Sequence, residues 1–131
     1  MFRLKNAAEL PEVSDGTRIL VEPLRSNATS KTRLQIDISL QAVAPSAVLR
    51  NKFKSHDSQT WNEFQHLYRV ELAKNTLGTQ AVLNAAHKGN VTLVYTSKDP
   101  QHNSAIVLKE YLERVLIVDH ELFRDDTIDC F

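Results

Sequence analysis

The segment from Tyr95 to Asn103 holds the strongest candidates for chemistry in this sequence. It follows a run of β-branched and apolar residues and precedes a segment with helical spacing, so we expect it where a strand ends and a helix begins. Ligands of open α/β sheets bind outside the carboxyl ends of the strands, and a helix N-terminus offers free N–H groups and a partial positive charge. Lys98 would add a cation, and His102 a group that titrates near neutrality. These features predict a site for a small anionic ligand.

The same segment also has a purely structural interpretation. In it, Asn103 caps the following helix, Asp99 orders the turn, Tyr95 packs against the core and Lys98 is a solvated loop cation. The residues alone do not separate this interpretation from a binding site.

Two arginines could add positive charge to such a site. Arg18 begins a predicted strand that Glu22 ends, and Arg25 follows in an exposed loop. At strand rise Arg18 and Glu22 lie about 13 Å apart, which is too far for them to pair. A buried arginine in a strand usually has a carboxylate partner, so a structural ion pair is favoured for Arg18 over catalysis. The candidate ligand-binding residues are Arg18, Arg25, Tyr95, Lys98, His102 and Asn103, and no reaction is assigned to them.

Sequence motifs of common enzymes and metal sites are missing. There is no His-Glu-x-x-His spacing, no Gly-x-Ser-x-Gly, no phosphate loop and no Gly-x-Gly-x-x-Gly, and the whole chain has three glycines. We therefore predict no metal site and no cofactor. The pair His56-Asp57 precedes a helix and fits a capping role better than a catalytic one.

The composition describes an ordinary globular protein. With 131 residues, 42% of them hydrophobic and 24% charged, the chain fits one domain, and we expect residues 120–131 to form a C-terminal tail. Sixteen basic and sixteen acidic residues cancel, so nucleic-acid binding is not favoured, although Arg50, Lys52 and Lys54 could form a local basic stripe. No apolar run approaches the roughly 18 residues of a membrane span. With Cys130 as its one cysteine, the chain fits the reducing cytoplasm.

Strand and helix patterns alternate along the chain. Strands are predicted at residues 2–5, 18–22 and 91–95, the last of them central because it is apolar on both faces. Helices are predicted from Ser46, over the stripe Trp61, Phe64, Tyr68 and Leu72 with a start at Thr60, over 79–88 after a break at Gly78, and over 104–116. Residues 115–118 could extend that last helix or form an edge strand. The fold class is α/β, a small single domain with a mainly parallel sheet of about three or four strands and helices packed on its faces.

A set of short motifs in fixed order resembles a known family. They are Asp15-Gly16-x-Arg18-x-Leu20-Val21, Ala44-Pro45-Ser46, the 61–72 stripe with Glu71-Leu72, and Val91-Thr92-Leu93-x-Tyr95-x-x-Lys98-Asp99-x-x-His102-Asn103. Over roughly residues 15 to 113 the chain is similar to the YeaO-like bacterial proteins, a family of unknown function. Those proteins follow the second strand with an Asp-Arg pair and a Leu-Trp-Pro-Arg-Gly loop, where this chain has Glu22-Pro23-Leu24-Arg25-Ser26-Asn27-Ala28. The resemblance implies a shared scaffold with one altered edge.

Two main hypotheses for function follow. The first is a domain that binds a small anionic ligand at the 95–103 turn. The second is a degenerate, non-enzymatic family member that acts through protein contacts or as a homodimer. A nucleic-acid accessory role is a weaker third.

Overall fold

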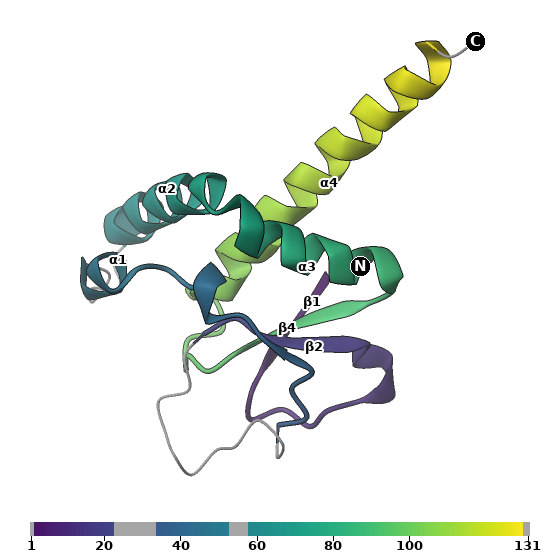
Figure 1. Ribbon diagram of the computed structural model, residues 1–131. Helices are drawn as coiled ribbons and strands as arrows, with labels where there is room; N and C mark the ends of the chain where they lie inside the picture. Colours follow the sequence, from purple (N-terminus) through teal and green to yellow (C-terminus); the bar gives the residue numbers. More distant parts are fainter. Residues whose placement is uncertain (1, 23–33, 53–57, 130–131) are drawn as a thin grey trace.

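The computed structural model describes residues 2–22, 34–52 and 58–129, with side chains except at 58–59 and 117–129. In these ranges four strands form one parallel sheet in the order β1-β4-β2-β3 (Figure 1). The strands are β1 (Phe2–Asn6), β2 (Thr17–Leu20), β3 (Ile38–Ser39) and β4 (Val91–Tyr95). The predicted α/β class with a parallel sheet is confirmed.

The strand β4 lies in the centre of the sheet, as its apolar sequence predicted. All five of its residues are buried, and it pairs with β1 on one side and β2 on the other. Because β1 and β2 both flank β4, the chain returns from the end of β1 to the start of β2 through a connection that contains the short 3-10 helix η1 (Val13–Asp15).

The two faces of the sheet differ in what covers them. On one face, residues such as Ile19 and Leu93 join a core that includes Leu108 and Leu112 of the C-terminal helix. On the other face, the Thr92 hydroxyl donates to the carbonyl of Asp15, 2.8 Å away, so the β1–β2 connection packs there. The described α-helices therefore lie on one face, and coil segments with the short 3-10 helix η1 cover the other (Figure 1).

The first two predicted helices form close to their expected positions. Helix α1 (Ala47–Lys52) is capped by the Ser46 hydroxyl, which accepts from the Leu49 amide. Helix α2 (Ser58–Lys74) begins two residues before the predicted start at Thr60. Its stripe is core at Phe64, Tyr68 and Leu72, whereas Trp61 at the end of the stripe is partly buried.

The prediction that Gly78 breaks the chain's helical pattern was wrong. Helix α3 (Thr76–Lys88) begins before Gly78, and the Asn75 side chain caps it by accepting from the Gly78 amide at 3.1 Å. A Cβ on Gly78 would lie 2.7 Å from Asn75 Nδ2 and 2.9 Å from Val43 Cγ1. Gly78 thus permits a close contact inside a helix, while Gly89 ends that helix as predicted.

The last helix, α4 (Ser104–Asp129), includes residues 115–118, so they extend the helix and form no edge strand. Residues 120–129, expected as a tail, continue the same helix, which projects away from the sheet (Figure 1). No helix in the described ranges is long and apolar enough to cross a membrane.

Candidate functional site

The turn between β4 and α4 contains a carboxylate from a distant part of the chain. Glu22, just after β2, accepts hydrogen bonds at Oε2 from the Thr96 amide (2.9 Å), the Thr96 hydroxyl (3.0 Å) and the Ser97 amide (3.2 Å). Its Oε1 accepts from the hydroxyl of Ser104, the first residue of α4, at 2.9 Å. The sequence predicted that Lys98 and the first helix amides hold an anion at this turn. The structure places the Glu22 carboxylate at the same turn, on a different set of donors from Thr96, Ser97 and Ser104.

Within the turn, the side chains of Asn103 and Asp99 have structural partners. Asn103 is buried and caps α4, since its Oδ1 accepts from the Ile106 amide at 3.0 Å while its Nδ2 donates to the Asp99 carbonyl at 2.9 Å. Asp99 Oδ1 accepts from the amides of Gln101 and His102. These hydrogen bonds to the carboxylate, the one from Gln101 first, hold the pKa of Asp99 below its ordinary value.

His102 lies beside Asp99 and an aromatic ring. Its Nδ1 is 3.2 Å from Asp99 Oδ2, its side chain is 34% exposed, and its ring meets Trp61 edge-on with centroids 5.0 Å apart. Lys98 is exposed. Tyr95 is buried at the end of β4, and burial, followed by the negative charges of Glu9, Glu22 and Asp99, raises the pKa of its hydroxyl.

Arg18 lies away from this turn. Its side chain is buried on the face of the sheet away from the α-helices. There Nη1 donates to Asp15 Oδ2 at 2.6 Å, and Nε and Nη2 donate to the Leu34 carbonyl. The structural ion pair expected for Arg18 is therefore present, with Asp15 as the carboxylate. The structure brings together Tyr95, Lys98, His102 and Asn103 but not Arg18, and Arg25 and His56 lie outside the described residues.

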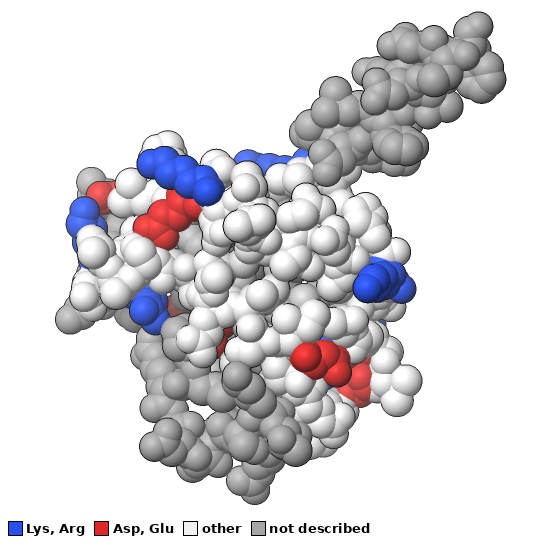
Figure 2. Space-filling model, viewed as in Figure 1, with Lys and Arg blue, Asp and Glu red and all other residues white. Residues whose placement is uncertain are grey.

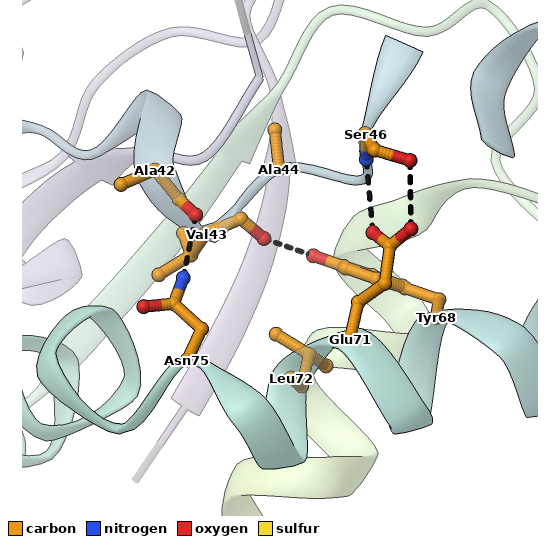
Figure 3. A pocket seen from close by; sticks show the side chains of 8 residues that line it. All are labelled: Ala42, Val43, Ala44, Ser46, Tyr68, Glu71, Leu72 and Asn75. Carbon is orange, nitrogen blue, oxygen red and sulfur yellow. Dashed lines mark hydrogen bonds between the residues drawn. The ribbon is translucent and has the colours of Figure 1, made fainter. Parts of the chain in front are cut away.

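Sequence reasoning did not assign Glu22 to this site or identify a second polar region around Glu71. The Glu71 carboxylate accepts from the Ser46 amide at 2.9 Å and the Ser46 hydroxyl at 2.7 Å, and both residues lie beside a cavity (Figure 3). Ser46 and Glu71 both belong to the motifs that carry the family resemblance. Their place in those motifs is the sequence signal that could have identified this region. Among the described residues, no group of His, Cys, Asp and Glu could hold a metal ion.

The fold and the turn define a small α/β domain with one helical layer, in which the chain's own carboxylate fills the strand-end position. The comparisons assign it more narrowly. The chain belongs to the inactive DUF488-N3 subclade, whose family model matches residues 1–129. It is 32% identical over 111 residues to the uncharacterized protein YeaO of Escherichia coli (strain K12), which covers 85% of this chain and 96% of that protein. No solved structure gives a significant match. The resemblance to YeaO-like proteins is thus confirmed.

Proposed function

We propose that this protein is a non-enzymatic member of its family, with the strand-end turn closed by Glu22, and that it acts through contacts with another protein. The observation that carries the proposal is the Glu22 carboxylate, which already occupies the Thr96 and Ser97 amides and the Ser104 hydroxyl at the strand end. An anionic ligand would have to displace the Glu22 carboxylate from these donors. Membership of the inactive DUF488-N3 subclade agrees with this assignment.

The action through protein contacts rests on apolar side chains that the fold leaves outside. Leu10 is 82% exposed and Val13 fully exposed on the β1–β2 connection, and Leu77 is 87% exposed in the first turn of α3. Figure 2 shows charged groups mainly toward the margins of one face of the molecule and uncharged residues over its middle. Contiguous exposed apolar surface marks contacts with other proteins. We therefore place the proposed contact either at Leu77 on α3 or at Leu10 and Val13 on the β1–β2 connection. The simplest partner is a second copy of the chain.

Replacing Glu22 by alanine tests the closure. In Glu22→Ala the donors of Thr96, Ser97 and Ser104 lose their acceptor, so acetate should bind there and raise the melting temperature as its concentration increases. The wild-type protein should show no such rise beyond a general salt effect. The measurement is a thermal melt in acetate and in chloride at equal ionic strength, with amide NMR shifts locating the bound anion.

Glu113→Ala is the matched control, because Glu113 is a partly exposed carboxylate on α4 that pairs with Lys109. Acetate should affect it as it affects the wild type. Phosphate or acetate binding to the wild-type protein, with shifts at Lys98 and His102, would instead establish the anion-ligand hypothesis and remove the present one.

Sedimentation velocity tests the protein contact with a second copy. A concentration-dependent shift that Leu77→Glu or Leu10→Glu weakens would support self-association, and a monomer at all concentrations would exclude it. The nucleic-acid hypothesis has weaker support, because the sixteen basic and sixteen acidic residues of the chain cancel. Lys54 of its basic stripe lies outside the described residues.

A further inference from the structure

A second site lies away from the β4–α4 turn, where α2 ends and α3 begins. A cavity of about 280 Å³ opens there against the 3-10 helix η2 (Gln41–Val43) and the residues that lead into α1 (Figure 3). Specific ligand pockets usually measure roughly 300–1,000 Å³. This cavity therefore has room for one side chain or a ligand of similar size. It is lined by Ala42, Val43, Ala44, Ser46, Tyr68, Glu71, Leu72 and Asn75.

The hydrogen-bond donors of the lining are already engaged. Both Ser46 groups donate to Glu71, the Tyr68 hydroxyl donates to the Val43 carbonyl, and Asn75 Nδ2 donates to the Ala42 carbonyl at 2.6 Å. An ionised carboxylate has about four acceptor positions, of which Ser46 uses two. The cavity therefore has spare acceptors on Glu71 and offers few donors, so it suits a ligand that donates.

The charge around the cavity favours a cation. Among the described residues, Glu71 is the charged residue of the lining, and neither lysine nor arginine lines it. Burial, followed by the negative charges of Glu22 and Glu71, raises the pKa of the neighbouring Tyr68 hydroxyl far above the ordinary value. The charge of Glu71 therefore acts on the groups around the cavity. A cation brought to Glu71 would meet no positive group among the lining residues.

We propose that this cavity binds a primary ammonium group carried on a short apolar chain. The ammonium donates to the Glu71 carboxylate. The methylene groups lie against Ala42 and Ala44, because Val43 and Leu72 are almost completely buried. A lysine side chain of another protein and a free alkylamine share this chemistry. A purely structural role for Glu71, holding Ser46 at the start of α1, is the alternative that the experiment must exclude.

The probes are n-butylammonium for the free amine and N-acetyl-lysine-N-methylamide for the lysine side chain, with n-butanol as the uncharged control. Titration into ¹⁵N-labelled protein at constant ionic strength should shift the amides of Ser46, Glu71 and Asn75, with a dissociation constant on the order of millimolar for so small a ligand. Butanol should leave them unshifted. Relative affinities of the two ammonium probes indicate which source the cavity accepts better.

Glu71→Gln should weaken butylammonium binding at least tenfold while the spectrum remains that of a folded protein. Should that variant fail to fold, Ala42→Leu fills the exposed rim without a change in charge and should also abolish binding. The proposal is overturned if butylammonium shifts no lining amide, if butanol binds as well as the amine, or if neither Glu71→Gln nor Ala42→Leu affects binding. Because none of these measurements involves Glu22, their failure leaves the proposed function untouched.

Discussion

Asp15 is fully buried, and its neighbours explain how it remains ionised there. Burial by itself raises the pKa of its carboxyl, but hydrogen bonds from Lys5, the Glu12 amide and Arg18 outweigh burial and leave the pKa below the ordinary value. Lys5 Nζ lies 2.9 Å from Oδ1 and Arg18 Nη1 lies 2.6 Å from Oδ2. Asp15 thus neutralises two largely buried cations on the face of the sheet that the helices leave uncovered.

Asp15→Asn should therefore destabilise the protein strongly. Removing one member of a buried ion pair leaves an uncompensated charge and typically costs about 3–5 kcal/mol. Glu12→Gln is the matched control: Glu12 also binds Lys5, but its side chain is 64% exposed, so its loss should cost at most about 1 kcal/mol. Urea unfolding at pH 7 measures both, and equal effects of the two variants would contradict the assigned role of Asp15.

The stability difference between the wild type and Asp15→Asn should also depend on pH. The folded pKa of Asp15 is depressed, so its contribution is fully present above the unfolded value of about 4 and is lost as the pH falls through the lower folded pKa. The stability difference between wild type and Asp15→Asn should therefore shrink when the pH falls below about 4. A difference that stays constant down to acid unfolding would show that Asp15 is not the titrating group.

For single residues, the sequence predicted the roles that depend on neighbours close in the chain. Arg18 was expected to have a carboxylate partner, and Asn103 was expected to cap a helix. Glu22 could not be assigned, because its donors Thr96 and Ser104 lie 74 and 82 residues away and only the pairing of β2 with β4 brings them near. Anion binding at the turn remains a prediction.

Among the elements, the junction of α2 and α3 shows how tertiary packing overrides a local signal. Glycine lowers helix propensity, so Gly78 predicted a break. The structure keeps it inside α3 because Asn75 and Val43 lie where a Cβ would stand. The spacing of the residues that flank Gly78 carries no information about Val43, which comes from η2.

Gly78→Ala tests this explanation. Alanine gains up to about 1 kcal/mol of helix propensity, but its methyl group forces Asn75 or Val43 aside, and overpacking typically costs about 1–3 kcal/mol. We expect a net loss of stability in thermal melts. Gln80→Ala, at an exposed position of the same helix, should change stability by no more than about 0.5 kcal/mol. A stabilised Gly78→Ala protein would mean that propensity dominates.

Across the whole molecule, the order β1-β4-β2-β3 follows from hydrophobicity more than from chain order. The largely apolar, β-branched run Val91–Tyr95 requires cover on both faces and neighbours on both edges, so it lies in the centre although it is the last strand. That much could be predicted. The one-sided placement of the helices could not, because the polar face depends on Asp15, Arg18 and Leu34, which meet only in the folded chain.

The length of α4 gives the last prediction. Among the residues of α4 whose side chains are described, Leu112 is the last fully buried one, and Val115 and Leu116 pack partly against the core. The helix then projects from the domain (Figure 1). Removing residues 120–131 should therefore change the free energy of unfolding by less than about 1 kcal/mol, whereas Leu112→Ala should cost about 2–5 kcal/mol through the cavity it creates. Urea unfolding of both proteins gives the comparison. If the truncated protein is as unstable as Leu112→Ala, the end of α4 is part of the folding unit, and sedimentation of both chains then determines whether it acts within one copy or between two.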